Sequence, residues 1–226
     1  MIKGFATSEG TNKFAESHID VPQQNYRKIQ SLTLSNVGIG TYLGNTDSET
    51  DLLMKNAIKK SVLQGVNVID TAINYRAQKS ERTVGKAISE LVEEEKINRN
   101  EIFISTKNGY VTNDADIQED FMDYVIREFG KTGIVKEGDI SSQYNCITTP
   151  FLEDQLARSK KNLGLECIDL MYLHNAIEGQ PQMPREKFIV YLKNIFEFFE
   201  RQRKEGNIRF YGLATWECFR VSKDNS

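Results

Sequence analysis

The sequence alternates strand-like apolar runs with helix-like amphipathic segments five times, and this alternation constrains the fold more than any other feature. The strand-like runs lie near residues 37–41, 66–70, 102–107, 168–173 and 209–214. In the segments between most of them, apolar residues recur every three to four positions, which is typical of helices that cover a sheet. Such an alternation predicts parallel strands joined by helical crossovers, arranged as an open doubly wound sheet or as a closed barrel.

The turn after the first run favours the barrel. Gly38 and Gly40 are followed by Gly44, one residue later than the dinucleotide-binding pattern GxGxxG requires, and no helix is expected to open there. The full phosphate-binding pattern GxxxxGK(S/T) is also missing from the sequence. The expected fold is therefore α/β and of the (β/α)8 TIM-barrel type, but incomplete, because only about five of its eight strand–helix units are recognisable.

Two parts of the chain depart from the alternation. Residues 1–30 are polar and weakly patterned, which predicts an amino-terminal extension or cap, and residues 31–226 are expected to form the partial barrel. Within the barrel, a segment at about 109–147 is expected to be an inserted loop and helix. The helix after the first run is expected to bury Leu52, Leu53, Ala57, Ile58 and Val62.

Charge and hydropathy exclude two classes of partner. The formal net charge is −3 and we find no long basic run, so neither nucleic acid nor an anionic membrane surface is an expected partner. No apolar stretch approaches the roughly 20 residues that span a bilayer, and the amino terminus lacks the apolar region of a signal peptide. We therefore expect a cytoplasmic protein.

The cysteines and histidines are too few and too scattered for a structural metal site. The sequence contains three cysteines (Cys146, Cys167 and Cys218), no CxxC pair, and only the histidines His18 and His174. Neither a zinc site nor a disulfide framework fits this pattern, so buried reduced thiols and no bound metal are expected.

Polar residues with acid–base chemistry stand where the predicted strands end. Asp70 ends the second run, Lys107 ends the third, His174 follows the fourth, and Tyr75 lies in the loop after Asp70. In a barrel of this type the carboxyl ends of the strands form one face, which carries the active site. We therefore expect the four side chains to meet at the mouth of the barrel.

These residue types suit the reduction of a carbonyl group. A free tyrosine has a pKa of about 10, and a neighbouring ammonium group favours the phenolate, while a carboxylate keeps the ammonium charged and in place. Tyr75 with Lys107 and Asp70 is thus a candidate general acid, and His174 is a candidate hydrogen-bond partner of the substrate oxygen. Each residue also has a purely structural interpretation, as a turn cap, a packed ring, a solvated lysine or a core histidine. Their coincidence at strand ends favours catalysis.

Longer motifs around these residues carry a family resemblance. The run DTAINYRAQKSERTVGKAI, residues 70–88, resembles the signature of the aldo-keto reductase family. The runs GIGTYLG, ISTK, IDLMYLHN and RFYGLATWE are similar to that family's first, third, fourth and fifth strands, and they follow in the family's order from about residue 35 to 217.

The resemblance implies a (β/α)8 barrel that binds NADPH and reduces a small aldehyde or ketone to an alcohol. It implies Tyr75 as proton donor, Lys107 and Asp70 as its tuning partners, and His174 as the substrate-orienting residue. The cofactor residues it implies are Gly40, Thr41, Asp70 and Thr215. The substrate-pocket residues it implies are Tyr42, Asn175 and Trp216.

Two departures from the family pattern bear on these expectations. The fifth strand of the family usually ends in Ser-Asn, whereas Ala214 and Thr215 stand here, so that only Thr215 keeps a side-chain hydrogen bond for the nicotinamide. The family's carboxyl-terminal third, which would grip the rest of the cofactor, is expected to be missing, and the chain is therefore interpreted as truncated. Its exposed sheet edges offer a route to self-association. The alternative function is a non-catalytic, reductase-like regulatory or interaction protein.

Overall fold

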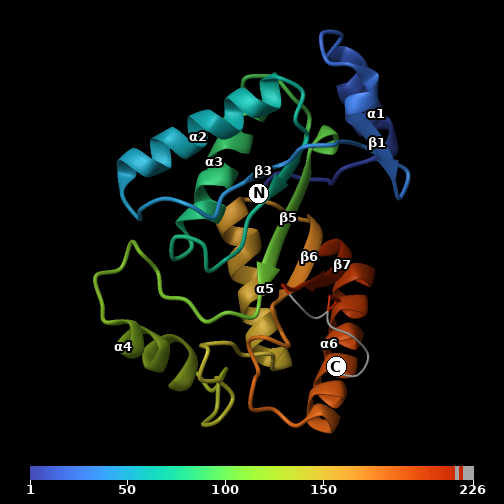
Figure 1. Cartoon of the computed structure of the whole chain (residues 1–226). Coiled ribbons are helices and arrows are strands. Elements are labelled where there is room, and N and C mark those ends of the chain that lie inside the picture. The colour runs from blue at the N-terminus through green and yellow to red at the C-terminus, as the bar shows by residue number, and fades with distance from the viewer. Residues whose placement is uncertain (217–218, 221–226) are drawn as a thin grey trace.

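The core of the molecule is a parallel sheet whose strands follow one another in chain order. A computed structural model describes residues 1–216 and 219–220 (Figure 1). In these residues the sheet contains β3 (Ile39–Gly40), β4 (Val68–Asp70), β5 (Phe103–Asn108), β6 (Ile168–His174) and β7 (Ile208–Ala214), hydrogen-bonded in that order. Each crossover therefore steps to the next position in the same direction, as in a barrel, whereas a doubly wound sheet reverses its order. The expectation of an incomplete (β/α)8 barrel is confirmed.

Four crossover helices cover the outer face of the sheet (Figure 1). They are α2 (Ser48–Leu63), α3 (Lys79–Glu93), α5 (Thr149–Leu163) and α6 (Arg185–Lys204). The limits of α5 follow from its sequence, because Pro150 suits the first turn and Gly164, with φ of +66°, ends the helix in the left-handed conformation.

The packing of α3 against α5 depends on a glycine. A Cβ atom at Gly85 would lie 2.6 Å from the carbonyl oxygen of Asn162 and 2.8 Å from that of Leu163. Only a residue without a side chain allows the two helices to approach so closely.

The prediction for α2 was partly wrong. Ile58 and Val62 are fully buried, but Leu52 is 54% exposed, Leu53 is 62% exposed and Ala57 is also exposed. The helix lies at the β3 edge of the sheet and packs on one neighbouring crossover helix, α3. Its second apolar face, with the edge strand, therefore lines an open groove in the part of the chain that the structure describes.

The residues before the barrel form a helix and a hairpin. Helix α1 (Ser8–Ser17) is followed by a 3-10 turn, η1 (Gln23–Asn25), and by the antiparallel pair β1 (Tyr26–Ile29) and β2 (Leu32–Ser35). Leu32 and Leu34 pack with apolar side chains near the amino-terminal ends of the barrel strands, among them Phe103. The hairpin thus covers the end of the sheet opposite to the predicted active site.

A buried ion pair fastens this amino-terminal end. Arg99, in the 3-10 turn η2 (Arg99–Glu101), donates a hydrogen bond of 2.6 Å to Asp169 of β6. The same carboxylate accepts the backbone amides of Ala6, at 2.6 Å, and Ile104, at 2.9 Å. One aspartate therefore holds the amino-terminal segment, β5 and β6 together.

The predicted inserted segment, at about 109–147, lies at the side of the sheet where the strands end (Figure 1). It contains α4 (Phe121–Val125), which continues into a π-helical turn, η3 (Ile126–Gly130). Arg158 of α5 fastens it by donating to Glu128, at 2.8 Å, and to the hydroxyl of Tyr124, at 3.3 Å. The segment is therefore an ordered part of the fold.

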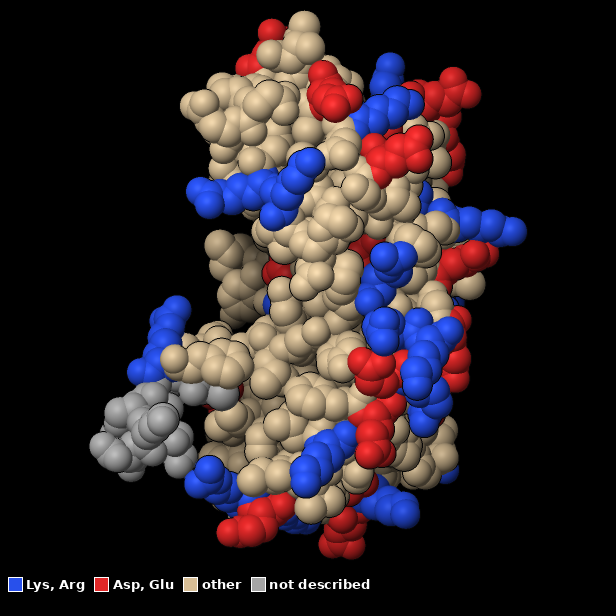
Figure 2. Space-filling view, turned by 90° about the vertical axis from the view of Figure 1, so that its right-hand side faces the viewer, with Lys and Arg blue, Asp and Glu red and all other residues tan. Residues whose placement is uncertain are grey.

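Charged side chains of both signs are mixed on the face of the molecule that Figure 2 shows. Figure 2 looks onto the side of the molecule that faces right in Figure 1, and it shows no large patch of a single sign. No helix in the described residues is long and apolar enough to cross a membrane. Cys146 and Cys167 are buried free thiols, as expected, whereas Cys218 lies outside the described residues.

Candidate active site

An ion pair between adjacent strands forms the centre of the site. The ammonium group of Lys107 donates to the Asp70 carboxylate at 2.6 Å and to the carbonyl oxygen of Thr71 at 2.8 Å. The second oxygen of Asp70 accepts a hydrogen bond of 2.7 Å from Ser105. Ser105 was missed at the sequence level, although alternation along a strand places residues 105 and 107 on the same face.

Tyr75 is placed directly against this pair. The Lys107 nitrogen lies 4.7 Å from the centroid of the Tyr75 ring. The ring packs edge-on against Tyr42, at a centroid distance of 5.0 Å, and against His174, at 5.9 Å. The structure therefore brings together Asp70, Tyr75, Lys107 and His174, as the strand ends predict.

His174 is held in the neutral form. The residue is 7% exposed, and its Nδ1 atom is buried without a hydrogen-bond partner among the described atoms. Burial, assisted by the charge of Lys107, lowers the pKa of His174 to about 4. At neutral pH the imidazole is thus uncharged, with one nitrogen able to donate a hydrogen bond and the other able to accept one.

A second tyrosine that the sequence did not indicate also faces the histidine. The Tyr110 ring lies 5.0 Å from the His174 ring, edge-on, and Asn175 donates to the Tyr110 hydroxyl at 3.5 Å. Tyr110 forms an antiparallel bridge with Asn145, whose side-chain amide donates to the carbonyl oxygen of His174 at 3.2 Å. Both ends of the inserted segment are thus anchored beside the histidine.

Asp70 lies in β4, and the other predicted cofactor residues lie in or directly after the two edge strands, β3 and β7. Gly40 is exposed in β3, and the buried hydroxyl of Thr41 donates to the carbonyl oxygen of Asp70 at 3.3 Å. At the other edge, the Thr215 hydroxyl and the Trp216 amide both donate to the carboxylate of Glu178. Trp216 itself is 71% exposed. Thr41 therefore joins the central cluster, whereas Thr215 and Trp216 lie at the opposite edge of the sheet.

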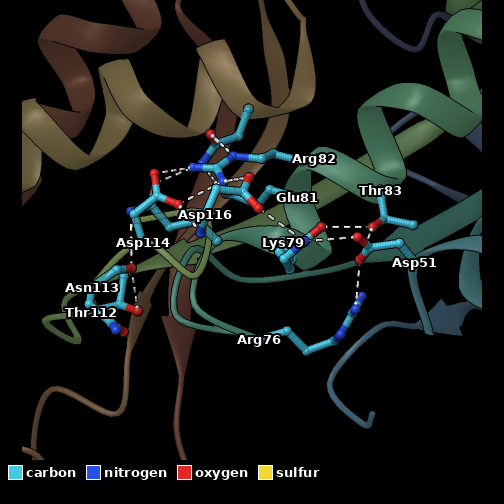
Figure 3. Close-up of polar contacts among 12 residues, drawn as sticks. Asp51, Arg76, Lys79, Glu81, Arg82, Thr83, Thr112, Asn113, Asp114 and Asp116 are labelled. Carbon is cyan, nitrogen blue, oxygen red and sulfur yellow. Dashed lines mark hydrogen bonds and ion pairs between the residues drawn. The ribbon is translucent and has the colours of Figure 1, made fainter. Parts of the chain in front are cut away.

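The loop after Tyr75 is part of an ionic network (Figure 3). The Asp51 carboxylate of α2 accepts hydrogen bonds from Arg76, at 2.6 Å, and from Lys79, at 3.0 Å. Lys79 also pairs with Asp116 at 3.0 Å, and Arg82 binds both Asp114 and Asp116. The network connects α2, α3 and the start of the inserted segment.

No group of metal ligands accompanies the cluster. Within residues 1–216 and 219–220, no three histidine, cysteine, aspartate or glutamate side chains are grouped so that they could hold a metal ion.

Parallel strand–helix units with acid–base residues at the strand ends are the design of TIM-barrel enzymes. The sequence profile of the Aldo/keto reductase family matches residues 36–223, and the chain belongs to this family.

A curated relative is the NADH-specific methylglyoxal reductase of Escherichia coli (strain K12), which is 25% identical over 188 residues. The alignment covers 81% of this chain and 49% of the relative. The chain therefore spans about half the length of the curated relative that it matches.

Solved structures show the same fold. An aldo-keto reductase from Bacillus halodurans, in its holo form, matches with a TM-score of 0.53 and 24% identity, over 84% of this chain and 50% of that one. An aldo/keto reductase from Klebsiella pneumoniae, in complex with NADP and acetate, matches with a TM-score of 0.54 and 17% identity, over 89% and 55%.

Proposed function

We propose that this chain carries the proton-donating part of a reductase site, in which a nicotinamide cofactor reduces a small aldehyde or ketone to an alcohol and Tyr75 donates the proton. One observation carries the proposal. The Lys107 ammonium group is paired with Asp70 at 2.6 Å and lies 4.7 Å from the centroid of the Tyr75 ring. The same positive charge therefore interacts with the Asp70 carboxylate and with the tyrosine ring.

This geometry supports the following roles for the four residues. When bound, the nicotinamide group supplies a hydride to the carbonyl carbon, and the carbonyl oxygen then needs a proton. Tyr75 gives the proton from its hydroxyl group, and the Lys107 ammonium group stabilises the phenolate that remains. Asp70 keeps the ammonium group in place. The neutral His174 ring donates a hydrogen bond to the same oxygen and orients it.

The residues present fit the nicotinamide end of the cofactor. A Cβ atom added to Gly40 would meet no heavy atom within 4 Å, so the surface beside Thr41 and Asp70 is open to a flat ring. The hydroxyl group of Thr215 and the amide of Trp216 offer hydrogen bonds, which Glu178 accepts in this structure.

We propose NADPH as the cofactor. Support comes from the Klebsiella pneumoniae structure, whose name gives NADP. The curated Escherichia coli relative is named NADH-specific, so both cofactors belong in the test.

The proposed substrate pocket is aromatic. Tyr42 and Tyr110 flank Tyr75 and His174, and Asn175 reaches Tyr110. We assign the reaction to the cytoplasm, a location that the buried free thiols of the fold support.

The test measures oxidation of NADPH and of NADH by the 226-residue protein, with and without small aldehydes and ketones. Replacing Tyr75→Phe removes the proton donor while keeping the ring, and kcat is expected to fall by about 100-fold or more. Tyr191→Phe, on α6, is the matched control and should leave the rate unchanged. An unchanged rate in Tyr75→Phe would contradict the assignment of the acid.

Titration of the cofactor fluorescence separates this proposal from a non-catalytic role. Cofactor binding without carbonyl-dependent oxidation, over a broad panel of carbonyl compounds, would favour a reductase-like binding protein instead.

A further inference from the structure

Tyr75 is followed at once by a left-handed turn that contains no glycine. Arg76, Ala77 and Gln78 have φ angles of +51°, +48° and +74°. Residues with a side chain adopt this conformation rarely, because the Cβ atom crowds the backbone. Where such residues persist, the surrounding structure holds them, and they concentrate at functional sites. The turn therefore requires anchors outside itself.

Arg76 supplies the first anchor. Its side chain is only 1% exposed, although arginine is usually found at the surface. The guanidinium group donates to the carbonyl oxygen of Asn45 at 2.6 Å and to the Asp51 carboxylate at 2.6 Å. Asn45 lies in the loop before α2, and Asp51 lies near the start of α2. Figure 3 shows the arginine reaching from the turn to Asp51.

The opposite side of the turn is held by the inserted segment. The carbonyl oxygen of Ala77 accepts the backbone amide of Ala115 at 3.1 Å, and the buried Gln78 side chain donates to the carbonyl oxygen of Asn113 at 3.1 Å. The turn is thus fixed between two separate parts of the chain.

We propose that Arg76 is a positioning residue for the proton donor. By holding the left-handed turn against α2, it fixes the backbone next to Tyr75 and keeps the tyrosine ring between Lys107 and His174. This inference rests on the proposed function of Tyr75 as the acid. Arg76 acts through the backbone, and no contact between its guanidinium group and the tyrosine ring is needed.

The geometry explains why arginine is required. The guanidinium group has donors on separate nitrogens of a planar fork, and Nε donates to Asn45 while a terminal nitrogen donates to Asp51. Lysine would keep the charge and a donor for Asp51 but would have no nitrogen at the place of Nε, so the bond to Asn45 would be lost. Alanine would remove both bonds, so residue 76 would no longer hold the strained turn against α2.

The experiment reads the environment of Tyr75 directly. The tyrosines are replaced by 3-fluorotyrosine, and the resonance of residue 75 is assigned in the ¹⁹F spectrum with Tyr75→Phe. In Arg76→Ala the resonance is expected to shift, because the ring leaves its place beside Lys107. Arg76→Lys should recover part of this shift.

A matched control removes a different buried arginine. Arg99 has a side chain 4% exposed and pairs with Asp169 at the far end of the sheet. Arg99→Ala removes a comparable buried ion pair but should leave the Tyr75 resonance in place. A resonance that stays unchanged in Arg76→Ala, or that moves equally in Arg99→Ala, would overturn the proposal.

A second variant covers the case in which Arg76→Ala does not fold. Asp51→Asn weakens the bond between Arg76 and α2 from the side of α2. The sequence of the turn and Lys79 stay unchanged. The Tyr75 resonance should move in the direction that Arg76→Lys produces. A folded Asp51→Asn protein with an unmoved Tyr75 resonance would also refute the inference.

The spectrum needs no turnover, so its outcome is independent of the reduction assay. If Tyr75→Phe leaves carbonyl reduction unchanged, the proposed function fails. The spectrum can still show that Arg76 positions the Tyr75 ring. If reduction depends on Tyr75, Arg76→Ala should lower kcat by about 10- to 100-fold, with a much smaller change in KM.

Discussion

His174 makes the stability of the protein dependent on pH in a predictable window. Its pKa is about 4 in the folded chain, whereas the ordinary value for histidine is 6.5. Between these values the unfolded chain binds a proton that the folded chain does not bind. Stabilisation from the neutral ring is therefore fully present above pH 6.5 and is lost as the pH falls through 4.

The size of the effect follows from the difference in pKa. One pKa unit corresponds to about 1.4 kcal/mol, so the complete loss, reached below pH 4, is on the order of 3 kcal/mol. Between pH 7 and pH 5 the same linkage gives a loss of about 2 kcal/mol.

Urea unfolding of the native protein and of His174→Asn, at pH 7 and at pH 5, measures this loss. Comparing the two proteins at each pH cancels the titration of carboxylates that both share. The native protein should lose about 2 kcal/mol more than the variant on acidification. Introducing Lys107→Met into both proteins should reduce this difference, because the lysine charge is the second cause of the lowered pKa. An equal loss in native protein and variant would refute the reasoning.

Three further changes test the packing and the edges of the fold. Gly85→Ala should destabilise by about 1–3 kcal/mol, although alanine favours helices, because its Cβ would press on the backbone of α5. Asp169→Asn should cost about 3–5 kcal/mol, because Arg99 would keep its charge in a buried site. Self-association through the open edges should raise the mass in light scattering with concentration, and Leu53→Lys should reduce it.

A specific result would contradict each of these three expectations. A rise in the urea midpoint of Gly85→Ala would show that α3 and α5 separate easily. An Asp169→Asn protein as stable as the native one would show that Ala6 and Ile104 need only a neutral acceptor. A constant monomer mass at every concentration would contradict association through the edges.

The alternation of the sequence predicted the strands because burial repeats locally along a chain. Val68–Asp70 and Phe103–Asn108 lie within two residues of their expected positions. The same periodicity could not show that α2 has one crossover helix beside it, so Leu52 and Leu53 were wrongly expected inside. An apolar face allows a helix to pack against a neighbouring element. Whether that face is buried depends on how many elements lie beside the helix in the fold.

The central residues of the site were predictable for a similar reason. Asp70, Lys107 and His174 follow from the strand ends, since parallel strands bring their carboxyl ends to one face. Tyr110 and Arg76 were not predictable. A left-handed turn without glycine has no local signal, and the partners of Arg76 lie 25 and 31 residues earlier in the chain.

The order of the strands has a consequence for how the chain is made. Each parallel strand pairs with the strand that precedes it in the sequence, so a growing chain can add one unit at a time to an existing edge. The first residues do not share this advantage. Ile2 forms a β-bridge with Leu165, and the amide of Ala6 donates to Asp169, which lies 163 residues later. During translation, the segment that contains Ile2 and Ala6 is thus fastened only after β3, β4, β5 and the start of β6 have been synthesised.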